Sequence, residues 1–313
     1  MNMQNYAEVA VRGKTIRVPT IVIDGRTVIV TGGLIKTAKI LDAEFVEGNL
    51  VNDPTTFISK LHEDGLGVDV FTFPQKVYDE TPKYPYPFDW DNAAVVSTVS
   101  FDDWWTKLPQ ESRKNARRAA KRGIIVQTAK FDESLIKGIK GVYDESPVRQ
   151  GKRFWHYGKD LETVKKENNS YHERSEFIGA YLNGELIGFM KFVCVDQAAI
   201  VMQILSRTSH FDKRPMNALI AKAVEVCQER GLSYLVYGKY TYGNKDKSQL
   251  SEFKRRNGFV RMEFPRYFIP LTLSGKIFTW LKLHRGLLGL LPPELIELLR
   301  RIRAALLCLT HKK

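Results

Sequence analysis

The stretch that most constrains the fold of this chain covers residues 177–268. It opens with two runs of alternating apolar residues on either side of Asn183-Gly184. Asn-Gly in this setting is the strongest short-range signal for a β-hairpin, because a type I′ turn needs positive φ at both central residues. A third apolar run at residues 198–205 predicts another strand. We therefore expect this stretch to begin as an antiparallel sheet.

The next segment, PMNALIAKAVEVCQERG, predicts a helix over residues 215–231. Pro215 stands near its start and Gly231 at its end, the positions that these residues favour in helices. Its buried face is expected to contain Leu219, Ala223, Val226 and Cys227. A strand at 233–238, a short basic helix at 249–258 and a strand at 259–270 complete the order.

This order, with two helices on a mostly antiparallel sheet, resembles the fold of the GNAT acyltransferases. The segment SEFKRRNGF, residues 251–259, resembles their Fem-like branch, and RKNARRAAKRG, residues 113–123, looks like the basic helix that Fem-like proteins carry upstream. That branch includes transferases that move amino acids from aminoacyl-tRNA to peptidoglycan precursors. The resemblance covers about half of the chain. It implies an α/β (α+β) fold with a mixed, mostly antiparallel sheet flanked by helices.

Three parts are expected along the 313 residues. Residues 1–100 are β-rich, with a second hairpin turn at Asp24-Gly25, and in a Fem-like protein they would be a degenerate GNAT-like half. Residues 101–273 would form the acyltransferase domain, and residues 274–313 a basic amphipathic tail. The segment 78–92 combines prolines with aromatic and acidic residues, which predicts a surface loop.

The formal net charge of +13 favours an anionic partner: nucleic acid, an acidic carrier protein, a phosphorylated small molecule or a membrane surface. The three cysteines are widely separated and form no CxxC pair, so we expect no metal site and no disulfide framework. The N-terminus lacks the apolar core of a secretory signal, which predicts a cytoplasmic protein.

The tail predicts a basic amphipathic helix. Its apolar face would contain Leu295, Leu299, Ile302, Leu306 and Leu309. Such a helix can lie in an anionic bilayer interface, which would place the protein at the inner face of the membrane through residues 276–313. Packing of the same helix on its own domain or on a partner subunit is the alternative.

Two further segments carry candidate binding residues. In the helix expected from about residue 109 to 122, cations surround a narrow face of Ala116, Ala119 and Ala120. Among these cations, Arg113, Arg117 and Lys121 are candidates for a phosphate clamp, and a merely solvated helix is the alternative.

The aromatic, basic and glycine-containing segment 146–160 is typical of a binding loop. Arg149, His156 and Tyr157 are its candidate substrate-binding residues, and Glu145 just before it is a candidate catalytic carboxylate. A structural histidine is the alternative for His156.

The family resemblance adds further candidates. GNAT enzymes hold the pyrophosphate of coenzyme A with a glycine-rich turn before the central helix, but here Arg214 and Met216 replace those glycines. Lys213, Arg214 and Asn217 are the donor-binding candidates at this turn. Lys254 stands where many GNAT enzymes have a catalytic tyrosine, and the resemblance to Fem-like proteins implies that it stabilises an oxyanion. Tyr240 is the candidate for a phenol acid.

The leading hypothesis is an N-acyltransferase that moves an acyl or aminoacyl group from an activated, phosphate-bearing donor to an amine. Acyl-CoA or acyl carrier protein would be the co-substrate, no cofactor would be tightly bound, and the acceptor could be linked to a lipid. One alternative is an aminoacyl transferase that uses charged tRNA. The other is a non-catalytic binding protein on a degenerate GNAT frame, because a fold does not fix a function.

Overall fold

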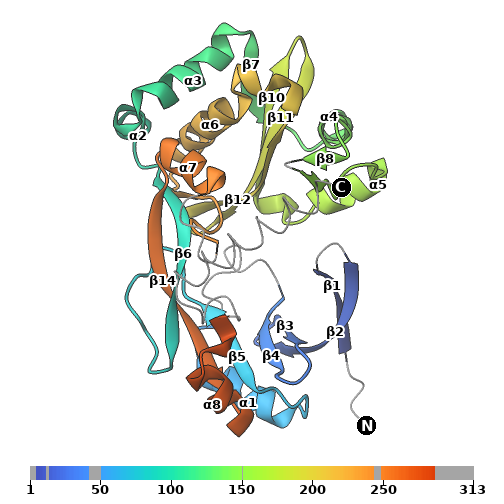
Figure 1. Ribbon diagram of the computed structural model, residues 1–313, viewed down its shortest axis with the longest axis vertical. Coiled ribbons are helices and arrows are strands. Elements are labelled where there is room, and N and C mark those ends of the chain that lie inside the picture. The colour runs from blue at the N-terminus through green and yellow to red at the C-terminus, as the bar shows by residue number, and fades with distance from the viewer. Residues whose placement is uncertain (1–4, 12–13, 42–50, 150, 243–247, 286–313) are drawn as a thin grey trace, which may run out of the picture.

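The computed structural model describes residues 5–11, 14–41, 51–149, 151–242 and 248–285. The predicted fold class is confirmed: one large, mostly antiparallel sheet is flanked by helices (Figure 1). The order of elements predicted for residues 177–268 is confirmed as well. These elements are β10 (Ser175–Leu182), β11 (Glu185–Val195), β12 (Ala198–Ser206), α6 (Pro215–Glu229), β13 (Tyr234–Val236), α7 (Gln249–Arg256) and β14 (Val260–Pro270).

Both predicted hairpin turns form. Asn183 and Gly184 have φ values of 51° and 82°, and Asp24 and Gly25 have φ values of 49° and 71°. The second turn joins two of the seven strands and helices before residue 100. These are β1 (Asn5–Val11), β2 (Lys14–Ile23), β3 (Arg26–Thr31), β4 (Thr37–Ile40), α1 (Pro54–Glu63), β5 (Val70–Pro74) and β6 (Phe88–Ser97).

The central region and the end of the described chain are mainly helical. The elements here are α2 (Phe101–Lys107), α3 (Gln110–Lys121), β7 (Ile124–Ala129), α4 (Glu133–Tyr143), β8 (Val148–Arg149), β9 (Lys152–Arg153), α5 (Leu161–Asn168), η1 (His172–Arg174), η2 (Thr208–Lys213), α8 (Leu273–Trp280) and η3 (Leu283–Arg285). Ala119 of α3 is fully buried, but Ala120 is exposed, so the apolar face of this helix is narrower than predicted.

Twelve strands form one sheet in the order β1-β2-β3-β4-β5-β14-β6-β13-β12-β11-β10-β7. The two halves of this sheet repeat one arrangement, in which a helix connects two parallel neighbouring strands. In one half α1 connects β4 to β5, and in the other α6 connects β12 to β13. The long strands β6 and β14 lie between these two parts, β14 against β5 and β6 against β13 (Figure 1). The sheet is thus continuous across residue 100, and the division predicted there stays a prediction.

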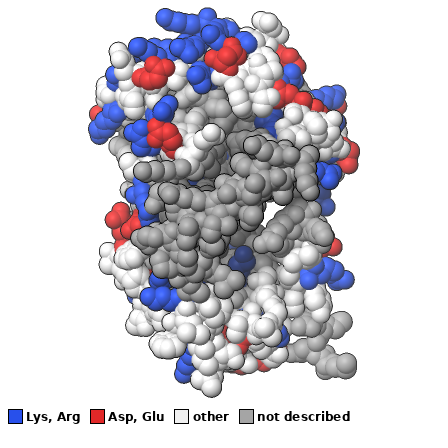
Figure 2. Space-filling model, in the orientation of Figure 1, with Lys and Arg blue, Asp and Glu red and all other residues white. Residues whose placement is uncertain are grey.

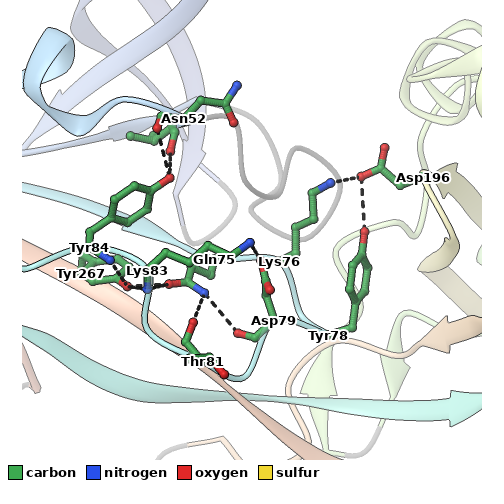
Figure 3. Close-up of polar contacts among 11 residues, drawn as sticks. Asn52, Gln75, Lys76, Tyr78, Asp79, Thr81, Lys83, Tyr84, Asp196 and Tyr267 are labelled. Carbon is green, nitrogen blue, oxygen red and sulfur yellow. Dashed lines mark hydrogen bonds and ion pairs between the residues drawn. The ribbon is translucent and has the colours of Figure 1, made fainter.

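The prediction of a loop over residues 78–92 is wrong for its last five residues, which begin β6. The antiparallel partner β14 supplies the reason, because it pairs with β6 from Phe88 onward. Hydrogen bonds also hold the preceding loop against β14. The hydroxyl of Tyr267 on β14 donates to Gln75, and the side-chain amide of Gln75 donates to the carbonyls of Asp79 and Thr81 in the loop (Figure 3). Tertiary pairing therefore overrides the local sequence signal.

The buried face predicted for α6 is confirmed. Leu219, Ala223, Val226 and Cys227 are at most 2% exposed and pack in the core between α6 and the sheet. The helix predicted around Leu295–Leu309 lies outside the described residues. Within the described ranges, no helix combines the length and the apolar character needed to cross a bilayer.

Candidate functional site

A cavity of about 710 Å³ opens where β12 separates from β13. The ladder between these strands ends at the pair Ile200–Val236, but β12 continues to Ser206. Ile204 and Ser206 of this extension and Tyr237, which follows β13, line the cavity. Because a β-strand without a neighbour presents backbone N–H and C=O groups, the extension can hydrogen-bond a bound molecule.

The remaining walls come from segments far apart in the sequence. They comprise Ser112 and Asn115 of α3, Arg149 and Phe154, Thr208 and Phe211 of η2, Arg214 to Asn217 at the start of α6, and Gln249, Leu250, Phe253, Arg256 and Asn257 at α7. The lining thus combines apolar side chains with three arginines, of which Arg149 pairs with Glu145 and Arg256 with Glu252. This composition suits a ligand with an apolar part and an anionic part that Arg214 can bind.

Three buried polar atoms among the lining residues have no hydrogen-bond partner within the described ranges. They are Asn115 Oδ1, Arg149 Nε and Ser206 Oγ. A buried polar group without a partner costs about 1–3 kcal/mol, so native proteins usually satisfy such groups with water or a ligand. Their concentration at one cavity supports a ligand site there.

Glu145 fastens the loop that leads to α6. Its carboxylate accepts hydrogen bonds from the backbone N–H groups of Thr208 (2.6 Å) and Ser209 (2.9 Å) and from both hydroxyls. Arg149 Nη2 lies 3.4 Å from the same carboxylate. Burial raises the pKa of Glu145, but the hydrogen bonds from Ser209 and Thr208 outweigh it and lower the pKa from 4.5 to about 2. A carboxylate with this pKa favours a positioning role over proton transfer, and its predicted catalytic role stays a prediction.

We expect Glu145 to stabilise the fold in a pH-dependent way. Its pKa is depressed in the folded state, so its contribution is complete above the unfolded value of 4.5 and is lost as the pH falls toward 2. A pKa shift of this size corresponds to a contribution of about 3 kcal/mol to the free energy of unfolding at neutral pH. Denaturant unfolding of wild type and Glu145→Gln should differ by roughly this amount at pH 7, and the difference should shrink toward zero at pH 2.

Glu133→Gln is the matched control, because Glu133 is an exposed carboxylate that pairs with Lys137. It should give no pH-dependent difference of comparable size. If the Glu145 difference stayed constant between pH 7 and pH 2, the assignment of the depressed pKa to this carboxylate would be wrong.

The turn before α6 has a left-handed residue at Arg214, with φ 62° and ψ 40°. Its side chain lines the cavity at the helix N-terminus, where the partial positive charge of the helix favours anions. Asn217 also lines the cavity, and its amide donates to Asn257 Oδ1 at 2.9 Å, which ties α6 to α7. Lys213 lies 3.5 Å from Asp212 and is not a lining residue.

Lys254 is fully buried behind the cavity wall. Its ammonium donates to the backbone carbonyl of Lys239 at 2.7 Å and lies over the rings of Tyr237 (4.4 Å) and Tyr242 (5.3 Å). Burial lowers the pKa of Lys254 from 10.5 to about 8. Tyr237 both contacts this ammonium and lines the cavity, whereas Lys254 itself does not line it and Tyr240 packs at the edge of the core. Both roles predicted from the resemblance stay predictions.

His156 is largely buried and stacks on Tyr143 at 4.4 Å. Its Nε2 lies 3.2 Å from the Gln203 amide, and Gln203 accepts a hydrogen bond from the Tyr143 hydroxyl at 2.7 Å. Burial, and then Lys159, lower the pKa of His156 to about 4, so the ring is neutral near pH 7. This environment favours the structural alternative, and neither His156 nor the exposed Tyr157 lines the cavity.

The structure therefore brings three of the predicted residues, Arg149, Arg214 and Asn217, to one cavity. The candidates Arg113 and Arg117 line a separate hollow, and Lys121 lies on the exposed side of α3. Sequence reasoning missed Arg256 and Ser206 at the cavity. Arg256 stands in the basic helix already identified, two residues from Lys254, but no local pattern marks Ser206 at the end of a strand.

No protein-family model and no curated protein matches this sequence. Solved structures do match over most of the chain. The structure of FemX has a TM-score of 0.57 and 9% identity over 89% of this chain and 90% of its own. L-PGS from Bacillus licheniformis has a TM-score of 0.55 and 15% identity over 87% and 89%.

A third match is the C-terminal domain of a putative lysylphosphatidylglycerol synthetase from Agrobacterium fabrum. It has a TM-score of 0.55 and 11% identity over 84% of this chain and 87% of that domain. Each likeness covers at least 84% of this chain and therefore includes residues on both sides of residue 100. The chain thus has a Fem-like GNAT fold, as the resemblance implied.

Proposed function

We propose that the protein transfers an acyl or aminoacyl group from an activated, anionic donor to an amine. The observation that carries this proposal is the cavity between β12 and α7. It combines an edge of β12 that no described strand pairs beyond Ile200 with Arg214 and Arg256. Backbone N–H and C=O groups of the strand edge would hydrogen-bond polar groups of the donor, and the arginines would bind the donor's phosphates. The names of the matched structures, FemX and lysylphosphatidylglycerol synthetase, support aminoacyl or acyl transfer on this fold.

Two chemical requirements of such a transfer have candidates here. The attacked carbonyl needs a hydrogen-bond donor that strengthens its contact as the oxyanion forms. Lys254, whose ammonium donates to the carbonyl of Lys239 and whose pKa burial lowers, would be this hydrogen-bond donor after a small movement of Tyr237. The amine must lose a proton, which solvent would accept, and the phenol of Tyr240 would donate a proton to the thiolate or ribose oxygen that leaves the donor.

Aminoacyl-tRNA is the second candidate donor. Arg214 stands in the left-handed position that glycine usually takes, so its side chain, and not a bare backbone turn, meets the ligand. This arrangement suits phosphates bound by side chains better than a pyrophosphate bound closely by backbone N–H groups. A lipid acceptor is supported by the name lysylphosphatidylglycerol synthetase and by the exposed Ile277 and Trp280 on α8 and Leu281 just after it.

A thermal-shift experiment with coenzyme A, acetyl-CoA, a long-chain acyl-CoA, acyl carrier protein and charged tRNA tests the proposal. A donor at 100 times its Kd should stabilise the folded protein by about 2.7 kcal/mol, and Arg214→Gln should weaken that binding about tenfold or more. Arg261→Gln is the control, because Arg261 is an exposed arginine on β14 paired with Glu263. Absence of any shift across the panel would contradict the proposed donor site.

A further inference from the structure

A second hollow lies on the opposite side of α3 from the cavity. It has a volume of about 320 Å³ and is lined by Trp105, Thr106, Gln110, Arg113, Lys114 and Arg117; we call it the α2–α3 pocket. Ser112 and Asn115 face the cavity, whereas the residues of α3 that line the α2–α3 pocket lie about half a helical turn away. One helix thus separates two distinct sites.

Contacts within the protein hold the two arginines of this pocket in place. Arg113 Nη1 donates to the carbonyl of Thr106 at 2.6 Å, at the C-terminal end of α2. The Arg117 guanidinium lies 5.4 Å from the ring centre of Trp105, and the Trp105 ring in turn stacks on Phe101 at 5.7 Å. Most of the ten N–H groups of the two guanidinium forks stay available to a ligand.

Within the described part of the chain, the positive charge of this pocket has no neutralising carboxylate. Among the described residues, no carboxylate lies within ion-pair distance of Arg113, Lys114 or Arg117, whereas Arg122 at the end of the same helix pairs with Asp212. Arg113 and Arg117 are one turn apart, a spacing at which like charges destabilise a helix. Figure 2 shows lysines and arginines gathered at the end of the molecule where Figure 1 places α3 and β7.

We propose that the α2–α3 pocket is a second anion site that binds phosphate groups. Two fixed guanidiniums can bind phosphate oxygens in a bidentate manner, and Lys114 adds a mobile point charge at the rim. A small phosphorylated molecule and a phospholipid headgroup both carry this chemistry. The inference goes beyond the proposed transferase, because the pocket stands on its own contacts and takes no part in the reaction at the cavity.

Calorimetric titration with pyrophosphate is the first test, in the Arg214→Gln protein so that the cavity contributes less. Adding Arg113→Gln and Arg117→Gln should weaken pyrophosphate binding at least tenfold. The matched control adds Lys60→Gln and Lys137→Gln, which remove the same charge from exposed positions on α1 and α4 and should change the affinity less than twofold. Unfolding midpoints verify that all proteins fold.

Two further arms distinguish the source of the phosphate and the role of geometry. Co-sedimentation with phosphatidylglycerol vesicles, compared with phosphatidylcholine, tests a lipid headgroup with the same variants. Arg113→Lys keeps the positive charge but removes the guanidinium that can bind phosphate through two N–H groups. It should weaken pyrophosphate binding about fivefold. Loss in the pocket variant for either ligand supports the site. Equal loss in the control variant, or no loss for pyrophosphate and vesicles alike, would overturn it.

Discussion

Replacement of Lys254 by Met should lower kcat of the proposed transfer by a factor of about 10² to 10³, the usual loss when one oxyanion donor is removed. Met retains most of the buried volume, and it removes a charged group whose burial is costly. The expected result is therefore an inactive but folded protein. The measurement is transfer from the donor that the thermal-shift panel identifies, followed as release of free thiol or deacylated tRNA.

Lys191 provides a matched control for this experiment. It is also buried, and burial lowers its pKa from 10.5 to about 8 as well. Its ammonium donates to the carbonyls of Asn168 (2.8 Å) and Ser170 (2.6 Å), away from the residues that line the cavity. Lys191→Met should therefore change the free energy of unfolding, with kcat of the folded fraction kept.

The pH profile gives Lys254 a second readout. Because the protonated form carries the charge, kcat should decline above the pKa of about 8, and this alkaline decline should be absent in the residual activity of Lys254→Met. Full activity in Lys254→Met, with an unchanged pH profile, would remove Lys254 from the reaction and leave the β12 backbone as the source of oxyanion stabilisation.

Replacement of Asp91 by Ala should lower the free energy of unfolding by about 3 kcal/mol, because it removes a buried carboxylate from Arg266, whose side chain is 11% exposed. Lys239, the other cation of the pair, is 36% exposed and contributes less to this loss. Asp91 is 8% exposed and lies 2.9 Å from Lys239 Nζ and 2.8 Å from Arg266 Nε. This cluster joins β6, β14 and the segment after β13. Chemical denaturation at neutral pH measures the effect.

The control is Asp196→Ala, because Asp196 pairs with Lys76 at the surface, where its side chain is 51% exposed (Figure 3). Surface pairs of this kind contribute about 0–1 kcal/mol. Burial raises the pKa of Asp91, but Arg266 and Lys239 outweigh this effect and lower it. Its contribution should therefore be lost at acid pH, as the carboxylate becomes protonated. Equal effects of the two substitutions would show that the buried cluster adds no special stability.

The Asp91 cluster also links stability to the candidate site. Lys239, which it holds, provides the carbonyl that accepts the hydrogen bond from Lys254. A conservative Asp91→Asn change should therefore reduce stability less than Asp91→Ala and yet disturb the position of Lys254. No local sequence pattern indicates this connection, because Asp91, Lys239 and Lys254 come from three separate elements.

The sequence by itself determined the local elements of this protein. Asn183-Gly184 and Asp24-Gly25 fixed two hairpins, Pro215 and Gly231 marked the ends of the central helix, and the spacing of its apolar residues identified the buried face. These features depend on backbone conformation and side-chain periodicity over fewer than about twenty residues, and both can be read directly from the chain.

Only the tertiary structure decided the arrangement of the candidate site. The cavity exists because β12 continues after β13 ends, and its walls unite Arg149, Arg214 and Arg256 from distant segments. In the tertiary structure Glu145 accepts hydrogen bonds from Thr208 and Ser209, which are 63 and 64 residues away in the sequence. Strand pairing and burial create these relationships across long sequence separations, where no local periodicity records which residues will meet.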